Sequence, residues 1–182
     1  QALRELAPAG VLEDLAGEWA GNVAKPERYA LQGQATGLSL APSVQGAGMR
    51  PGLAGARVAF KLDEREGRAD VTMDKGWLAF PGVFEEPEIP VSRLQARVEW
   101  QHEQGQWTVR VSKADFANAD AQGQLEAEWR TSRPGERAPD GSPLSALPGW
   151  LRMTGSLKQA QATRVWRYLP NTIPADTRAY VR

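Results

Sequence analysis

Few side chains in this sequence have the chemistry of a catalytic or metal-binding group. The 182 residues include one histidine, His102, and no cysteine. His102 lies in the predicted turn 101–105, whereas a general base or a metal ligand needs a second ligand or an orienting carboxylate held in a cleft. We therefore predict that His102 is a solvated loop residue, and that the protein is not an enzyme and holds no cofactor or metal.

Two acidic segments carry enough carboxylates to suggest a cation site. Glu85, Glu86 and Glu88 stand among prolines that space them along an extended chain, which is typical of a solvated loop. Segment 115–120 has a faint likeness to a calcium-binding loop, but the ligand spacing is wrong and the required Gly and distal Glu do not follow. Neither segment predicts a metal site.

The seven tryptophans are the third group that could bind a ligand, because exposed indole rings stack on sugars or lie at membrane interfaces. Trp100, Trp107 and Trp129 share the alternation of the neighbouring aliphatic residues, so we expect them to point inward with those residues. Trp77 and Trp150 lie next to Gly at strand entrances and are candidates for exposure. Two scattered rings do not make a sugar-binding platform.

The elements that position these residues are predicted to be strands. Apolar and polar residues alternate over 56–63, 94–101, 107–112, 121–130 and 151–158, the period of a strand with one buried and one solvated face. Gly67 and Gly105 supply turns for two successive hairpins, whose likeness to each other indicates an internal repeat. We predict a mainly β fold, a curved antiparallel sheet built from repeated hairpins as an open or taco-like groove, with short helices at the two ends.

The chain is predicted to be a single β-rich segment over 1–182, which we interpret as part of a larger repeat protein. We expect a short helical region over 1–15, antiparallel strands over 16–130 and a flexible loop over 131–149. A strand over 150–158 and truncated helical turns over 163–182 follow. The prolines within 80–90 predict a crossing loop or an edge segment between the hairpins.

Positive and negative charges balance, with 22 Lys and Arg against 22 Asp and Glu. No nucleic-acid partner is expected, since phosphate binding needs a basic surplus. Residues 63–103 nevertheless carry ten acidic and five basic residues, whereas 151–182 carry one acidic and six basic residues. The C-terminal segment could attract lipid head groups or complement the acidic region of a neighbouring repeat, and we favour packing between repeats. The longest uncharged stretch, 31–49, is interrupted by Gly, Gln, Ser and Pro, and neither a transmembrane helix nor a signal peptide is predicted.

Four strings of the chain resemble segments of the YhdP-type proteins of the AsmA-like family. They are PVSRLQARVEW at 90–100, NADAQGQLEAEW at 118–129, TRVWRYLP at 163–170 and IPADTR at 173–178. The resemblance implies a large Gram-negative envelope protein, anchored in the inner membrane and reaching across the periplasm. In such bridge-like lipid-transfer proteins, repeated β-units form a gutter with an apolar floor that carries phospholipid toward the outer membrane. The partners that the resemblance implies are phospholipid, neighbouring repeats of the same chain and other envelope proteins.

We therefore predict a periplasmic segment that shields phospholipid acyl chains in an apolar β-groove during transport between the inner and outer membranes. The candidate lipid-contacting residues are the apolar positions of the alternating strands: Val58, Phe60, Leu62, Val98, Trp100, Trp107, Val109, Val111, Leu125 and Trp129. A second interpretation stays open, because alternating strands are common to sandwiches and barrels. In that interpretation the apolar face is sealed by a second layer, and the chain is a structural or adaptor domain that binds a protein partner.

Overall fold

The strands form one antiparallel sheet in which each strand pairs with the next along the chain. The computed structural model describes residues 7–22, 25–43, 50–133, 135–137, 141–142 and 149–180. The strands are β1 (Ala9–Asn22), β2 (Lys25–Leu40), β3 (Gly52–Asp63), β4 (Glu66–Ala79), β5 (Glu88–Glu103), β6 (Gln106–Ala117), β7 (Ala121–Arg130) and β8 (Trp150–Ala160). A 3₁₀ helix, η1 (Ala162–Tyr168), and a short α-helix, α2 (Ala175–Tyr180), follow. The predicted mainly β fold with an antiparallel sheet of hairpins is confirmed.

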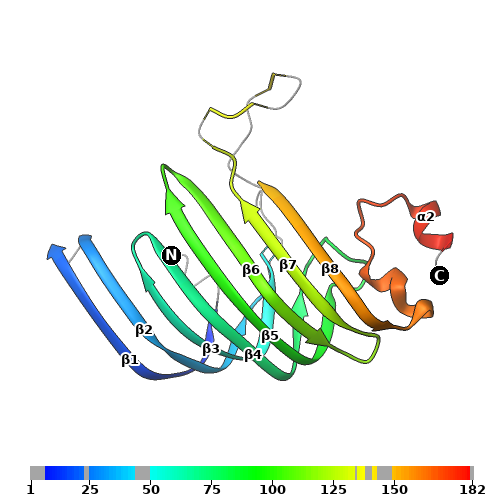
Figure 1. Ribbon diagram of the computed structural model, residues 1–182, viewed down its shortest axis with the longest axis horizontal. Helices are drawn as coiled ribbons and strands as arrows, with labels where there is room; N and C mark the ends of the chain where they lie inside the picture. Colours follow the sequence, from blue (N-terminus) through cyan, green and yellow to red (C-terminus); the bar gives the residue numbers. More distant parts are fainter. Residues whose placement is uncertain are drawn as a thin grey trace.

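The sheet is bent into a trough. Figure 1 shows the longer strands descending on one side, turning at the foot of the view and rising on the other side, so that the cross-section is U-shaped. We call the side that carries the β3–β4 and β5–β6 turns the first wall. The second wall contains the ends of β2 to β5 at 38–40, 52–54, 76–79 and 88–91, next to the β4–β5 loop at 80–87.

Irregular residues at the bend explain the curvature. Positive φ angles occur within strands at Gly37 (62°), Gly55 (86°), Lys75 (65°) and Lys113 (52°). The ladder shifts register near them, between Ala35 and Leu38, Ala54 and Ala56, and Val111 and Ala114. A β-bulge bends its strand and increases the local twist. An alternating sequence interrupted in this way therefore folds into a trough instead of a flat sheet.

The buried residues identify the inner face of the bend. Ala56, Met73 and Val91 form the core cluster and are 0%, 2% and 6% exposed. Ala35, Ala96 and Ala114 are also buried. In a sheet with no layer above it, a side chain is buried only where the strands curve around it. Because Met73 shares the alternation of Val71 and Ala69, the apolar positions line the inside of the trough.

The N-terminal part of the chain corrects one prediction. The helical region expected over 1–15 is wrong from Ala9 onward, where the residues form β1, and residues 1–6 lie outside the described residues. A bulge at Asp14, with φ of 51°, interrupts the alternation. Leu12 therefore pairs with Ala35 while Leu15 lies against Gly33 on the same face. The resulting three-residue spacing of leucines imitates the stripe of a helix.

The two segments predicted to be loops, 80–90 and 131–149, both contain residues that contact the sheet. Pro90 lies in β5 and pairs with Trp77 of β4, but β5 extends here beyond its last pair with β6, Arg93 with Ala117, so Pro90 has a strand on one side only. The prediction of a crossing loop or an edge segment is therefore confirmed, with the loop at 80–87 and the edge at 88–90. After β7, Thr131 and Ser132 are buried. Residues 134, 138–140 and 143–148 of the predicted flexible loop lie outside the described residues.

Candidate functional site: an apolar trough

The predicted lipid-contacting residues lie on one face of the sheet. Cross-strand partners share a face, and the pairing places them in rows that run across the strands. One row joins Leu62, Trp100, Val109 and Trp129 through Gly67, and the next row joins Phe60, Val98 and Val111 through Ala69. Val58 pairs with Val71, Leu125 with Ala114 and Trp107 with His102. All ten therefore face the inside of the trough.

No part of the chain that the structure describes covers this inner face. Nine of the ten predicted residues are half-buried, and Trp107 is 41% exposed. Among the described residues, the contacts between strands follow the sheet order, and neither a second sheet nor a helix packs over the trough. The alternative of an apolar face sealed by a second layer is therefore wrong for this part of the chain. A contiguous exposed apolar surface of this kind marks a binding surface.

Sequence reasoning missed the apolar residues that extend the trough to both edges. These are Leu12, Leu15 and Trp19 of β1, Leu31 of β2, and Leu151, Met153 and Leu157 of β8. Those in β1 and β8 are 56–70% exposed. The pairing of Leu31 with Leu62 and of Leu151 with Trp129 continues the same row. In β8, the alternation of apolar and polar residues over 151–158 is the signal that could have identified these side chains. In β1, the bulge at Asp14 interrupts the alternation and hides the same signal.

The outer face is polar, and its charges pair across the strands. Arg97 Nε donates to Asp70 Oδ1 at 2.8 Å, and Arg110 Nε donates to Glu128 Oε2 at 2.8 Å. The hydrogen bond to Glu128 and the attraction of its charge raise the pKa of Arg110. A depression of about 440 Å³ on this face is lined by three basic and three acidic side chains, Lys61, Arg68, Arg110, Asp63, Glu66 and Glu99, among other residues. These charges balance, so the depression does not favour an ionic ligand.

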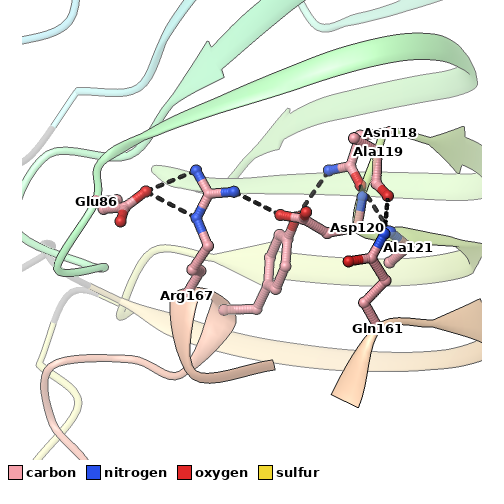
Figure 2. A network of polar contacts seen from close by, with 8 residues as sticks. Glu86, Asn118, Ala119, Asp120, Ala121, Gln161 and Arg167 are labelled. Carbon is pink, nitrogen blue, oxygen red and sulfur yellow. Dashed lines mark hydrogen bonds and ion pairs between the residues drawn. The ribbon is translucent and has the colours of Figure 1, made fainter. Parts of the chain in front are cut away.

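A polar network attaches the C-terminal segment to the trough (Figure 2). Arg167 of η1 contacts Glu86 Oε2 through Nε at 2.7 Å and Nη2 at 2.6 Å, and it donates to Asp120 through Nη1. The Tyr168 hydroxyl donates to Asp120 Oδ2 at 3.0 Å and accepts from Asn118 Nδ2 at 2.9 Å. The network joins η1 to the β4–β5 loop and to the β6–β7 turn.

The protonation of this network follows from its burial and its charges. Burial opposes the charge of Arg167, but the hydrogen bonds and the attraction of Glu86 and Asp120 outweigh it and raise the pKa of the guanidinium. Burial, more than any other cause, raises the pKa of Tyr168, so its hydroxyl keeps the proton that it donates. Arg178 Nη1 also lies 3.7 Å from Glu85 Oε2. Glu85 and Glu86 lie in the β4–β5 loop with side chains 48% and 45% exposed, as predicted for a solvated loop, and each also pairs with an arginine of the C-terminal segment.

His102 and the two outlying tryptophans also have definite places. His102 belongs to β5 and is half-buried, and its ring stacks on Trp107 with centroids 4.5 Å apart and planes at 18°. The prediction of a solvated loop histidine is wrong, because β5 extends two residues further than its alternation indicated. Trp77 is half-buried, whereas Trp150 is 50% exposed with the Arg130 guanidinium 5.5 Å from its ring centroid.

The fold and the trough define a class of protein, an open single-layer β-sheet with an apolar inner face and a charged outer face. The family model described as YhdP protein matches residues 1–182, and the chain therefore belongs to the YhdP family. Membership supports an envelope protein with a role related to lipid transport, and the family is not known as enzymatic. No curated protein and no solved structure matches the chain.

Two other kinds of site are absent from the described ranges. No helix there has the length and hydropathy of a membrane span. In the same ranges, no group of three or more His, Asp or Glu side chains is arranged to hold a metal ion.

Proposed function

We propose that this chain is a periplasmic segment of a lipid-transfer gutter, in which phospholipid acyl chains lie in the trough as they pass between the inner and outer membranes. The observation that carries the proposal is the uncovered concave face. An acyl chain laid on this face removes apolar surface of both partners from water, which stabilises the complex by about 25 cal/mol for each Å². The family's relation to lipid transport supports the same ligand.

Transfer at this level is passive. The acyl chain exchanges one apolar environment for another as it moves along the rows of the inner face, while its head group stays in water. The charged outer face keeps the segment soluble in the periplasm. Net direction is set by other components of the envelope.

The two edge strands suggest what extends the trough. β1 and β8 are exposed along their whole length, and each presents an unpaired backbone edge within the described sheet. β1 carries Glu13, Asp14 and Glu18 without a basic residue, whereas β8 carries Arg152 and Lys158 without an acidic one. Each strand is antiparallel to the next, so β8 runs opposite to β1. The β1 strand of a second repeat could therefore pair with β8 in the usual antiparallel way, with its acidic residues beside the basic residues of β8. We therefore place neighbouring repeats of the same protein at both edges.

The test of the proposal places a charge inside the trough. Val111→Asp puts a carboxylate between Val98 and Ala127, and Ser112→Asp puts the same group on the outer face opposite Arg97. The unmodified chain and Ser112→Asp should take up a fluorescent phospholipid from donor vesicles. Val111→Asp should bind at least about tenfold more weakly, because the buried carboxylate loses its hydration.

Circular dichroism shows whether each variant keeps the β-sheet. Equal uptake by both variants would contradict the proposal, and so would a folded, unmodified chain that takes up no phospholipid. A folded Val111→Asp chain is needed for the comparison, and Leu125→Asp provides a second inner-face position on β7 if Val111→Asp unfolds.

A further inference from the structure

We infer that the trough orients its lipid, with the head group at the rim of the first wall and the acyl chain directed toward the bend. This inference rests on the proposed function and adds where each part of the ligand lies. It comes from a set of inner-face side chains that join an aromatic ring to a polar N–H, O–H or ring nitrogen. We call this set the aromatic rim: Trp19, Tyr29, Trp100, His102, Trp107 and Trp129.

The strand register gives the depth of each member. His102 pairs with Trp107 next to the pair that closes the β5–β6 turn, Glu103 with Gln106, and Trp19 pairs with Tyr29 near the end of β1. Trp100 and Trp129 both pair with Val109, one row deeper. Trp19 is 70% exposed and Trp107 is 41% exposed. The aromatic rim therefore occupies the two inner-face rows closest to the turns.

The rows below the rim have no such polar atoms. The next row contains Phe60, Ala69, Val98, Val111, Ala127 and Met153. Val58, Val71 and Ala96 follow, and then Ala56, Met73 and Leu94 at the bend. Phe60 is aromatic but has no hydrogen-bonding group. The inner face thus changes from amphipathic rings at the rim to pure hydrocarbon at the floor.

The second wall lacks this gradient among the residues that pack on the core cluster. Leu38, Leu53 and Leu78 lie there and are aliphatic. In the adjoining β4–β5 loop, Phe80 and Phe84 pack on each other edge to face with centroids 5.9 Å apart, and neither ring carries a polar atom. The second-wall side chains that pack on the core cluster therefore lack the hydrogen-bonding groups of the aromatic rim.

Amphipathic rings prefer the boundary between hydrocarbon and water, where the ring contacts apolar groups and the polar atom reaches a hydrogen-bond partner. Immediately beyond the aromatic rim, the turns carry both signs of charge, with Glu64, Arg65, Glu66 and Glu103 among them. A phospholipid has the same order of chemical groups, from charged head group through ester oxygens to hydrocarbon. Aligning the lipid with the wall in this order places the head group beside the turns of the first wall.

The experiment uses the unmodified chain and two photoactivatable phospholipids. One carries a diazirine beside the head group, and the other carries it at the end of an acyl chain. After irradiation, mass spectrometry of proteolytic peptides locates the attachment sites. The head-group probe should label the aromatic rim severalfold more than the half-buried rows that contain Val98 and Val71, and the chain-end probe should show the opposite preference.

The outcomes separate the two proposals. Labelling of the trough by both probes with the same distribution, or with the reversed one, overturns the orientation but leaves the lipid-binding function standing. Absence of inner-face labelling with both probes overturns the proposed function itself.

A pair of variants tests the polar atoms of the rim. His102→Leu with Trp107→Leu keeps an apolar surface but removes a ring nitrogen and an indole N–H, and it should bind phospholipid while losing the rim preference of the head-group probe. Trp150→Leu is the matched control, because Trp150 pairs with Arg130 and therefore lies on the outer face, away from the trough. It removes an indole N–H without changing the aromatic rim. An unchanged rim preference in the double variant would overturn the role assigned to these groups.

Discussion

The two faces of this sheet are made by the same strands and differ only in which alternate residue each presents. On the outer face, charged side chains pair across strands, as in Arg97 with Asp70, and remain exposed. On the inner face, apolar side chains pair with one another, and Met73 at the bend is 2% exposed. The burial of Met73 therefore comes from the curvature of the sheet, since no second layer covers it among the described residues. Neighbouring residues of one strand lie on opposite faces. A substitution at one position therefore affects apolar packing in the trough, whereas a substitution at the next position affects exposed charge pairs.

The largest contrast between the faces is expected at the bend. Met73→Ala removes a buried side chain from the core cluster and should lower the free energy of unfolding by about 2–4 kcal/mol. Thr72→Ala, one residue away on the exposed outer face, should change it by less than about 0.5 kcal/mol. Urea denaturation followed by tryptophan fluorescence measures both. Similar losses for the two variants would contradict the assignment of the faces.

A smaller effect is expected where the C-terminal segment meets the second wall. Arg167→Gln removes the charge that pairs with Glu86 and Asp120 and should weaken the docking of η1 by about 1–3 kcal/mol. Hydrogen exchange should then rise in 162–168 and in the β6–β7 turn, while the strands of the first wall stay protected. Arg164→Gln, an exposed position in η1, is the control. Equal exchange in the two variants would argue against the network as the attachment.

The outer-face ion pairs should contribute little. Arg110 and Glu128 have side chains 57% and 48% exposed, so water and salt screen their attraction. Arg110→Gln is expected to change the free energy of unfolding by less than about 0.5 kcal/mol, and less again at high salt. A loss comparable with that of Met73→Ala, measured in the same urea experiment, would mean that the outer face contributes more than its exposure allows.

The smallest effect concerns the β3–β4 turn and depends on pH. Asp63 Oδ1 accepts hydrogen bonds from the backbone N–H groups of Arg65 at 2.8 Å and Glu66 at 2.9 Å, and these bonds lower the pKa of its carboxyl. A lowered pKa in the folded state stabilises the turn above the unfolded value of about 4 and loses that stabilisation as pH falls through the folded value. NMR should show the two amides losing protection only on acidification. Asp63→Asn should make their protection independent of pH in this range.

Local signals account for the parts of the molecule that the sequence predicts. Alternation and glycine turns are properties of a few neighbouring residues, and they predict the hairpins of β3 to β6 and the inward direction of Trp100 and Trp129. The same signal fails at β1, where the bulge at Asp14 shifts the alternation by one residue. Alternation also has the same form in a sandwich and in an open trough, so it does not predict whether the inner face is covered.

Non-local contacts explain what the sequence does not predict at the C-terminus. Arg167 and Glu86 are 81 residues apart, and only the opposite charges of their segments indicate an attraction. From the uneven distribution of charge we predict packing between repeats, whereas the structure pairs the acidic β4–β5 loop with the basic C-terminal segment of the same chain. The bend that brings the β4–β5 loop to η1 arises from the positions with positive φ at 37, 55 and 75, whose combined effect on the sheet is not a local pattern.

The most direct test of the central claim is the binding of an environment-sensitive apolar dye to the native chain, followed by displacement with phospholipid. An uncovered trough should bind the dye well below the unfolding transition, and phospholipid should reverse the fluorescence gain in proportion to its own uptake. Fluorescence that stays flat until the chain unfolds, or dye that phospholipid fails to displace, would contradict an open lipid-binding trough.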